Sequence, residues 1–384
     1  MKLLFFFHET GLHNGAWKSA HNLLLGLREK GVDILVVTPD KHELYNTLID
    51  EGFKVKAIKI VWNNNEIKKS WKYRIARVPY NLRRKVLSIV WWLRVLLIVK
   101  RFDPDVIHTN SSVFYLSYDI AKFLKIPHVW HIREYGDKDF NIDTKPVVHR
   151  FNDNYSSYIC IARDLEKHRC LNRTKKSHVV YNGILNENKI LYKPDKSNYF
   201  LYVGSLCEGK GIKDVIDAWL LFCNKYKNYY SLKIAGGHKS EILYYKDYVS
   251  KSAGLSAKIE FLGKRDDVYD LMSEAKAVIM ASYNEAFGRV TAEAMFCGAL
   301  VIGRDAAGTK EQFDNGVKIT GSEIGLRYTD KKGLLECINT VMFMEQKEYD
   351  SYIARAQMTV KKLYTNEVYV TNVYNIYKSI ISKK

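Results

Sequence analysis

The sequence lacks the features that mark several classes of protein. Its 384 residues hold six cysteines with no C-x-x-C pair, so neither a zinc knuckle nor a disulfide framework is indicated, and a reducing compartment fits best. Six prolines and 22 glycines exclude collagen-like and proline-rich architectures. The longest mainly apolar stretch, residues 86–99, includes Arg94 and is shorter than the roughly 20 residues that span a bilayer. The sequence therefore indicates a globular chain that is not integral to a membrane.

The apolar run at the start of the chain is also short. Residues 3–7 are apolar, whereas the apolar region of a signal peptide needs about 7–15 residues. We therefore interpret this run as a buried first strand. The length of the chain is comfortable for two domains.

Positive charge is concentrated in one window of the sequence. The formal net charge is +18, and residues 54–101 hold 14 Lys and Arg but a single acid, Glu66. Trp62 and Trp71 lie in the same window. Basic residues beside Trp and Leu on a helix suit an anionic membrane surface. A solvated basic face over a core helix and nucleic-acid binding are the alternatives, and no nucleic-acid motif supports the latter. The predicted membrane face comprises Arg83, Arg84, Lys85, Trp91 and Trp92.

Short apolar runs alternate with segments of helical periodicity in both halves of the chain. The strands predicted in the first half are 3–7, 32–38, 54–58, 106–108, 129–132, 158–161 and 179–181. Those predicted in the second half are 199–204, 231–237, 258–263, 277–282 and 300–303. Apolar strands that alternate with helices predict two parallel sheets, each covered on both faces. Residues 193–198 are the expected linker, and the tail after residue 345 is predicted to be helical.

Residues 282–295 concentrate groups that can bind a nucleotide. Glu285 lies on the loop after a predicted strand, and Glu293 lies in the helix that follows. Phe287 and Gly288 open that helix, so its backbone N–H groups and the positive end of its dipole would point at a diphosphate. Gly288 would let the backbone approach closely, and Glu293 can accept hydrogen bonds from a vicinal diol such as ribose.

The string E-x-F-G-x-x-x-x-E-A-M-x-x-G-x-x-V-I, which begins at Glu285, resembles the donor-binding motif of a known family. That family is the retaining GT-B glycosyltransferases of family four (glycosyl transferases group 1), of the bacterial surface-polysaccharide type. Residues 14–16, 104–108, 127–134, 181–183, 201–211 and 308–311 resemble further motifs of the family. The resemblance implies an α/β GT-B fold, in which two doubly wound Rossmann-like domains face each other across a cleft. The expected parts are an acceptor domain (1–192), a nucleotide-sugar domain (193–365) and a helix (366–384) that crosses back to the first domain.

The resemblance also implies roles for individual residues. Glu285 would hold a hydroxyl of the donor sugar, His131 would touch that sugar from the first domain, and Lys210 would stabilise the leaving diphosphate. These three form the expected catalytic set. The expected donor-binding set is Gly15, Ser205, Lys210, Arg265, Glu285, Phe287, Gly288, Arg289, Val290 and Glu293.

Two positions depart from the family pattern. Ser205 stands where many relatives have arginine, and Arg289 is the expected replacement for the missing cation. Gly15 is a single glycine where a pair is common, which weakens the expectation of a phosphate contact there.

The implied reaction is transfer of a sugar from a nucleotide-diphosphate sugar, with UDP favoured, to a hydroxyl of a glycan or lipid-linked acceptor (EC 2.4 class). We expect retention of configuration, no cofactor and no catalytic metal. The Asp103-x-Asp105 and Asp137-x-Asp139 pairs resemble the metal motif of another glycosyltransferase fold, but such pairs are frequent by chance. The expected setting is surface-polysaccharide synthesis, such as that of a capsule, at the inner face of the cell membrane. No nucleic-acid partner is expected.

Other functions compete for the same residues. Residues 204–211 (GSLCEGKG) are one residue away from a Walker A loop, because Gly211 replaces the hydroxyl that would bind Mg²⁺. A P-loop NTPase would also leave the pair of glutamates unexplained. A catalytically inactive, basic membrane-binding protein and an epimerase on the same fold are the remaining alternatives. Turnover of nucleotide sugars would exclude the inactive protein, and an epimerase would need no acceptor.

Overall fold

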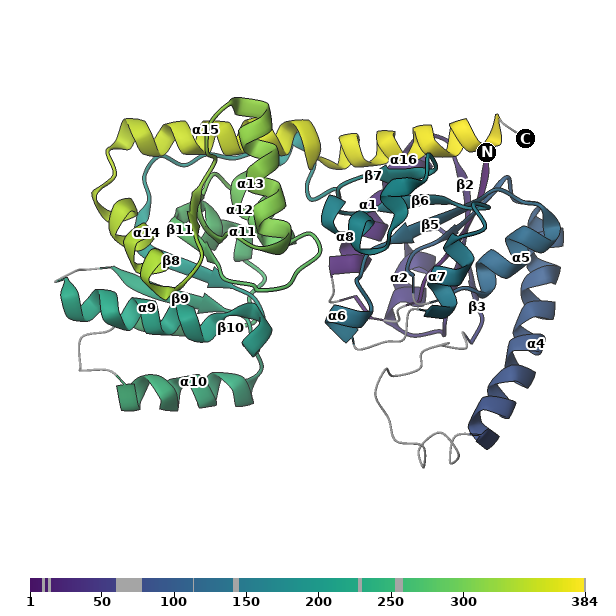
Figure 1. The fold of residues 1–384 in the computed structure, drawn as a ribbon, viewed down its shortest axis with the longest axis horizontal. Helices are drawn as coiled ribbons and strands as arrows, with labels where there is room; N and C mark the ends of the chain where they lie inside the picture. Colours follow the sequence, from purple (N-terminus) through teal and green to yellow (C-terminus); the bar gives the residue numbers. More distant parts are fainter. Residues whose placement is uncertain are drawn as a thin grey trace. The chain divides into compact units, whose positions relative to one another are not determined.

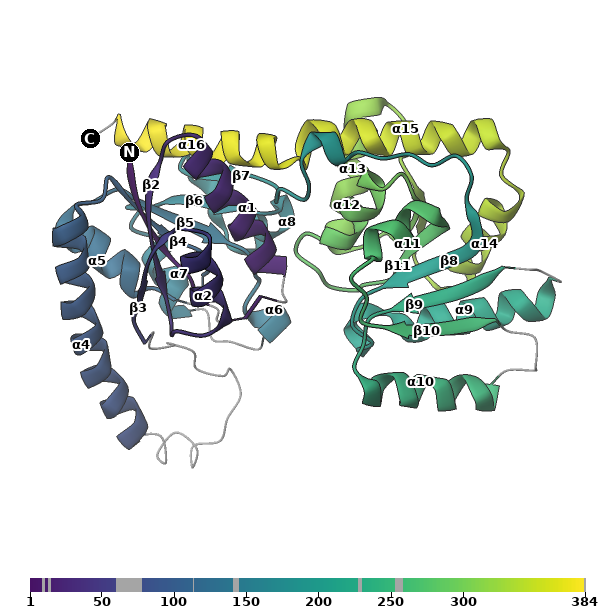
Figure 2. The ribbon, with the colours of Figure 1, turned by 180° about the vertical axis from the view of Figure 1, so that it is seen from behind.

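The computed structural model describes residues 1–8, 11–12, 15–59, 78–112, 114–140, 145–226, 230–252 and 258–382 (Figures 1 and 2). The side chains of 78–88, 139–140, 145–147 and 252 lie outside the description. The chain forms two compact units. Unit 1 comprises Met1–Gly183 and Tyr369–Lys384, and unit 2 comprises Ile184–Val368.

Unit 1 is built on a seven-stranded parallel sheet with the order β3-β2-β1-β4-β5-β6-β7. Its strands are β1 (Lys2–Phe6), β2 (Asp33–Thr38), β3 (Lys54–Ala57), β4 (Val106–Thr109), β5 (His128–Ile132), β6 (Ser157–Cys160) and β7 (Ser177–Val179). Successive side chains of a strand point to opposite faces. Leu3 and Phe5 accordingly join one core and Leu4 and Phe6 the other, which is why the first apolar run is a strand covered on both faces.

Helices cover both faces of this sheet. They are α1 (Gly15–Glu29), α2 (Glu43–Asp50), α4 (Val78–Phe102), α5 (Leu116–Leu124), α6 (Asp137–Phe140), α7 (Lys145–Phe151) and α8 (Arg163–His168), with the short turn η1 (Leu171–Arg173). The core on one face includes residues of α1 and α2, and the core on the other includes residues of α4 and α5. The layered arrangement is the doubly wound architecture predicted from the alternation of strands and helices.

The last helix, α16 (Asn366–Ile381), packs on unit 1 beside α1 (Figure 2). Tyr369, Val373 and Tyr377 are fully buried in the same core as α1. A Cβ atom at Gly26 of α1 would lie 2.5 Å from a Val370 methyl carbon, so only glycine permits this close contact. The C-terminal segment therefore completes the core of the unit that contains the N-terminus.

Unit 2 holds a six-stranded parallel sheet with the order β10-β9-β8-β11-β12-β13. Its strands are β8 (Ser197–Val203), β9 (Ser231–Ala235), β10 (Ile259–Gly263), β11 (Ala275–Met280), β12 (Leu300–Arg304) and β13 (Leu326–Tyr328). Its helices are α9 (Ile212–Lys225), α10 (Lys239–Ser252), α11 (Val268–Glu274), α12 (Arg289–Phe296), α13 (Ala307–Thr320), α14 (Lys331–Phe343) and α15 (Gln346–Leu363), with the turns η2 (Glu187–Lys189) and η3 (Glu208–Lys210). Trp219 of α9 and Ile338 of α14 are fully buried in the core of this unit.

The chain passes from unit 1 to unit 2 between Gly183 and Ile184 and returns between Val368 and Tyr369. The sequence placed these boundaries at 192/193 and 365/366. The expected linker, residues 193–198, lies within unit 2, and Ser197 already begins β8. Lys196 donates hydrogen bonds of 2.7 Å to the carbonyl oxygens of Ser273 and Gly298, which anchors this largely exposed stretch to unit 2.

Candidate functional site

The strand order of unit 2 creates a switch point between β8 and β11. From β8 the chain builds outward through β9 and β10, and from β11 it builds in the opposite direction through β12 and β13. Loops that follow two such neighbouring strands diverge, and ligands of open α/β sheets bind where they do. The loops after β8 and β11 are the two that carry Lys210 and Glu285.

Backbone contacts hold these two loops together. The Tyr283 N–H donates to the Gly209 carbonyl at 3.1 Å, which links the loop after β11 to the loop after β8. The Tyr202 hydroxyl donates to the carbonyl oxygens of Ser205 and Lys210 at 3.0 and 3.3 Å. Gly211 has φ +68°, and a Cβ atom there would lie 2.2 Å from the Ala281 carbonyl oxygen. Glycine is therefore required where the loops approach each other.

Lys210 and Glu285 meet at this switch point. The Lys210 Nζ lies 3.2 Å from the Glu285 Oε1, and the side chains are 30% and 26% exposed. The pair is accessible to a ligand, and each group already faces a partner of opposite charge. A phosphate that approached Lys210 would replace one anionic partner with another, and this exchange costs little desolvation.

The start of α12 lies beside the same loop and is fixed by neighbours. Gly288 caps the helix with φ +77°. The Gln312 side chain donates to the carbonyl oxygens of Phe287 and Gly288 at 2.5 and 3.0 Å. The Gly308 N–H donates to the Glu285 carbonyl at 2.8 Å, and a Cβ atom at Gly308 would lie 2.3 Å from the Phe287 carbonyl oxygen. The loop and the helix start are thus held in place by α13.

Glu293 and Arg289 form an ion pair on the first turns of α12. Arg289 Nη2 lies 3.3 Å from Glu293 Oε1, and the side chains are 12% and 9% exposed. Burial, with a contribution from the Glu293 charge, raises the pKa of Tyr269 and of the Cys297 thiol to about 12 each. Both neighbours are therefore neutral at ordinary pH, and Arg289 is the cation that accompanies this carboxylate.

The remaining predicted donor residues differ in their surroundings. Ser205 is exposed on the loop after β8, and Val290 is half-buried in α12. Phe287 is buried, and its ring lies edge-on to that of Tyr364, with 5.5 Å between the centroids. Arg265 follows β10, two strands from β8, and donates to the Asp267 carboxylate at 2.8 and 2.5 Å. The structure therefore groups Lys210 with Glu285 and Arg289 with Glu293, and pairs Arg265 with a carboxylate of its own loop.

Unit 1 has its own switch point, between β1 and β4. Gly15 is the first residue of α1, after the β1 loop, and is exposed. Asn14, which belongs to the same predicted glycine loop, lies outside the described residues. The phosphate contact predicted for Gly15 stays a prediction.

His131 lies inside β5, and its side chain has no exposed surface. Its ring lies edge-on to that of His108, with centroids 5.3 Å apart. Burial and the nearby charge of Arg133 hold the pKa of His131 well below its usual range, so the imidazole is neutral. The strand places this side chain inside unit 1. Any role of His131 in the reaction stays a prediction.

Arg133 and Glu134, at the end of β5, are polar groups to which the sequence interpretation gave no role. Both are 7% exposed. Arg133 donates to the side-chain oxygens of Asn110, Asn182 and Tyr369 at 2.7, 2.8 and 2.8 Å. Glu134 accepts from Ser111 and Ser112 through one carboxylate oxygen, Oε1. The feature that could have identified them from the sequence is their position directly after a predicted strand, because ligands of parallel sheets bind at the carboxyl ends of strands.

Metal-binding side chains do not cluster in the part of the chain that the structure describes. No group of three or more His, Cys, Asp or Glu residues has the proximity that a metal ion requires, within those residues. The predicted absence of a catalytic metal therefore stays a prediction to be tested by experiment.

Two known families match adjacent parts of the chain. Glycosyl transferases group 1 matches residues 184–359, most of unit 2, and Glycosyltransferase Family 4 matches residues 13–186, most of unit 1. The chain belongs to the group 1, family 4 glycosyltransferases.

Similar proteins agree with this assignment. N-acetyl-alpha-D-glucosaminyl L-malate synthase of Bacillus anthracis is 24% identical over 229 residues, which cover 56% of this chain and 57% of that relative. Anabaena HepE, solved in complex with UDP, is 19% identical with a TM-score of 0.77, covering 99% of this chain and 100% of that one. A glycosyltransferase of Rickettsia africae is 16% identical with a TM-score of 0.79, covering 100% of this chain and 99% of the other. These likenesses confirm the GT-B fold predicted from the sequence.

The structure corrects one part of the membrane face predicted for this glycosyltransferase. Trp91 is 2% exposed and packs against Phe6 and Phe114, so it belongs to the core. Helical periodicity turns it inward, while its neighbour Trp92 is half-buried against Phe123. The side chains of Arg83, Arg84 and Lys85 lie outside the described residues, as do Trp62 and Trp71.

Proposed function

We propose that this glycosyltransferase moves a sugar, with retention of configuration, from a UDP-sugar bound by unit 2 to a hydroxyl of a glycan or lipid-linked acceptor bound by unit 1. The observation that carries the proposal is the Lys210–Glu285 contact of 3.2 Å at the switch point of unit 2. The choice of UDP is supported by structures of Anabaena HepE with UDP and with UDP-glucose.

The chemistry follows from the charges at the site. As the bond between the anomeric carbon and the diphosphate breaks, negative charge develops on the leaving phosphate. The Lys210 ammonium group stabilises that charge, and the backbone N–H groups at the start of α12 do the same. The acceptor hydroxyl attacks the anomeric carbon from the same side and gives its proton to the departing phosphate oxygen. Glu285 orients the sugar by accepting a hydrogen bond from one of its hydroxyl groups.

Glu293 and Arg289 supply the nucleoside end of the donor site. The Arg289 ion pair uses the Glu293 Oε1 atom, and a carboxylate has acceptor positions on both of its oxygens. Glu293 can therefore bind the ribose diol while it is held by the guanidinium group. In this arrangement Arg289 orients Glu293, which is a different task from replacing the arginine absent at Ser205.

A thermal-shift screen with UDP, GDP and their sugars tests the donor assignment, because a ligand of the native state raises the melting temperature by mass action. UDP should raise the melting temperature of the wild type, and Lys210→Gln should reduce that shift. The matched control is Lys264→Gln, which removes an exposed lysine after β10. UDP release from a UDP-sugar in the presence of a mixture of glycan acceptors then tests turnover. Binding without release would favour the inactive membrane-binding alternative.

We further propose that α4 places the enzyme on an anionic membrane, where a lipid-linked acceptor of surface-polysaccharide synthesis would lie. None of the described helices has the length and apolarity needed to cross a bilayer. The observation in favour is a stripe on α4 in which Ile89, Leu93 and Leu97 are 61%, 53% and 56% exposed. They are four residues apart, so they share one helix face, and the exposed Arg94 lies beside them. The helix contains no Asp or Glu.

Vesicle sedimentation tests the α4 stripe. The double variant Leu93→Gln and Leu97→Gln should reduce sedimentation with phosphatidylglycerol vesicles, because it removes apolar surface that would enter the lipid. The control is Leu221→Gln with Leu243→Gln, which changes two leucines of unit 2 that are 49% and 58% exposed. Equal sedimentation of both variants and the wild type would reject the membrane proposal while leaving the donor site untouched.

A further inference from the structure

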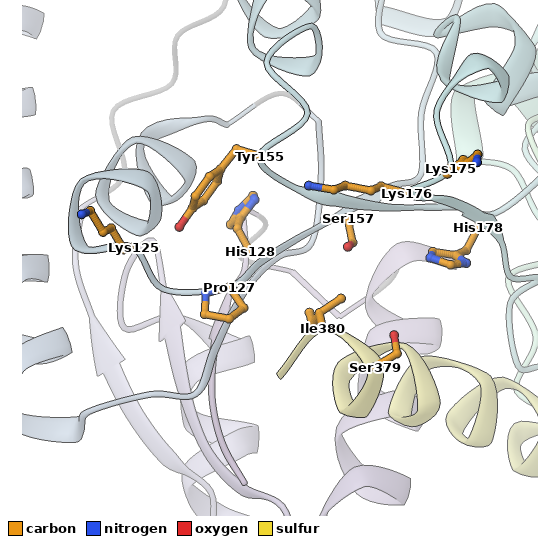
Figure 3. Close-up of a pocket in the computed structure, with 10 residues that line it drawn as sticks. All are labelled: Lys125, Pro127, His128, Tyr155, Ser157, Lys175, Lys176, His178, Ser379 and Ile380. Atoms are coloured by element: carbon orange, nitrogen blue, oxygen red, sulfur yellow. The ribbon is translucent and has the colours of Figure 1, made fainter. Parts of the chain in front are cut away.

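A pocket lies on unit 1 at the edge of the sheet where strands begin (Figure 3). It has a volume of about 290 Å³. His128 begins β5, Ser157 begins β6 and His178 follows the first residue of β7, so the amino ends of three adjacent strands line it. Ser379 and Ile380, near the end of α16, close another side. The polar groups Arg133 and Glu134 follow β5 at its opposite end, so this pocket is separate from that cluster.

The charged groups that line the pocket are all cations. Lys125, Lys175 and Lys176 belong to its lining, and no Asp or Glu does. The Lys176 ammonium group donates to the backbone carbonyl of Asn154 rather than to a carboxylate. Lys125 and Lys175 form no ion pair with a described residue. In Figure 3, Lys176 extends along the pocket toward Tyr155, and Lys125 and Lys175 stand at opposite ends.

The floor of the pocket is neutral and polar. His128 is 2% exposed, and its ring nitrogens contact the Thr109 and Ser156 hydroxyls at 2.8 and 2.7 Å. Burial lowers the pKa of His128 to about 3, so this ring is neutral at ordinary pH. Ser157 and Ser379 add hydroxyl groups to the lining. Lysines around hydroxyls form a surface that attracts a compact anion and repels a metal cation.

We propose that this pocket binds a phosphate monoester or inorganic phosphate, at a site separate from the donor site of unit 2. The Lys176 ammonium group extends along the pocket and can pair with a phosphate, while Lys125 and Lys175 add positive charge at its two ends. The Ser157 hydroxyl can donate to a further phosphate oxygen, whereas the Ser379 hydroxyl donates to the Ile376 carbonyl. Lys125 is two residues after Phe123, which is 64% exposed and contacts Trp92 of α4. The phosphate can therefore belong to a lipid headgroup or to a soluble molecule. The proposal does not depend on sugar transfer.

The first experiment measures the melting temperature of the full chain against increasing inorganic phosphate. The triple variant Lys125→Gln, Lys175→Gln, Lys176→Gln should lose the phosphate-dependent rise, with at least roughly a tenfold weaker apparent affinity. The matched control changes three exposed lysines of unit 2, Lys246→Gln, Lys347→Gln and Lys362→Gln, and carries the same net charge. The Lys210→Gln variant should keep the rise, which separates this pocket from the donor site.

The second experiment identifies the source of the phosphate. Vesicles of phosphatidylcholine with and without phosphatidic acid are sedimented with the wild type, the triple pocket variant and its unit 2 control. Loss of binding to phosphatidic acid in the pocket variant alone supports a headgroup, and a loss confined to inorganic phosphate supports a soluble ligand. If the triple variant fails to fold, Ser379→Glu takes its place, because it puts a carboxylate in the pocket. This single variant should also lose the response to phosphate. Responses of the pocket variants that equal those of the control in both experiments would overturn the proposal.

Discussion

The two units have the same kind of switch point, but the charged side chains near it are partly exposed in unit 2 and buried in unit 1. In unit 2, Lys210 and Glu285 are charged side chains that remain about a quarter exposed on two loops. In unit 1, Arg133 and Glu134 follow β5, the strand beside β4, and contact Asn110 and Ser111 of the loop after β4. Both side chains are 7% exposed. The histidines are also distributed unevenly between the two units: of the eleven in the sequence, only His238 lies between residues 184 and 368.

This contrast indicates how each unit uses its carboxyl edge. In unit 2, glycines permit close contacts between the loops, and these loops leave charged side chains accessible to a ligand. In unit 1 the polar groups instead stabilise the fold, because Arg133 donates hydrogen bonds to Asn182 and Tyr369. These residues adjoin the two points at which the chain leaves and re-enters the unit. A substitution in unit 2 should therefore change activity, and one in unit 1 should change stability.

The largest expected effect is on turnover, in unit 2. Glu285→Gln should lower kcat by ~10²–10³-fold, or about 3–4 kcal/mol of transition-state stabilisation, because the amide loses the charge that pairs with Lys210 and orients the sugar. UDP should still raise the melting temperature. Initial rates of UDP release measure the effect.

The control for this substitution is Glu208→Gln, an exposed acid on the turn that contains Lys210. It alters the net charge equally and should keep the wild-type rate. Equal rates for the wild type and the Glu285 variant would remove Glu285 from the reaction.

The sequence predicted the fold through its strands. The runs predicted in both halves overlap β1–β12, because strands covered on both faces are mainly apolar. The agreement is weakest at two strands of unit 1: β3 alternates lysines with Val55 and Ala57, and the run predicted at 179–181 shares only Val179 with β7. The strand missed was β13 (Leu326–Tyr328), which is only three residues long and lies at the sheet edge, where little apolar sequence is needed. The helices α6, α7, α8, α13 and α14 were also not assigned.

The candidate site was predictable where a loop motif carried it. Glu285 and Lys210 could be found because their neighbours, such as Gly288, have backbone requirements that restrict the sequence. The burial of His131 could not be predicted, because a histidine in a strand can point to the core or to its edge, and sequence alone does not decide which. Arg133 lay two residues further on, but its partner Tyr369 is 236 residues away in the sequence. Such a contact leaves no local pattern.

The second prediction breaks the buried cluster of unit 1. Arg133→Met should lower the free energy of unfolding of unit 1 by about 2–3 kcal/mol, because it leaves the Asn110, Asn182 and Tyr369 oxygens buried without their donor. The relief of a buried charge offsets part of the loss. Hydrogen exchange should accelerate in β5 and α16 and stay unchanged in β8.

Arg173→Met, which removes an exposed arginine of unit 1, serves as the control and should have little effect. Faster exchange in both units of the Arg133 variant would mean that the unfolding of the two units is coupled, contrary to the contrast drawn above.

The third prediction concerns acid. Burial lowers the pKa of His108, His128 and His131, to about 3 for His128. The unfolded chain takes up protons at these positions near pH 6.5, while the folded unit does not. Unit 1 should therefore be most stable above pH 6.5 and lose up to about 1.4 kcal/mol per pH unit for each histidine as the pH falls. Exchange in β5 should accelerate between pH 7 and pH 5 after correction for the intrinsic rate, and exchange in β8 should change less.

The smallest expected effect is that of metal removal. Lys210 already supplies a positive charge at the position assigned to the diphosphate, so a chelator should leave UDP release at its initial rate. The same charge would repel Mn²⁺ from the site unless Glu285 held it. Activity that disappears with EDTA and returns with Mn²⁺ would therefore assign Glu285 to metal binding, and the carboxylate of unit 2 would no longer be free to orient the sugar.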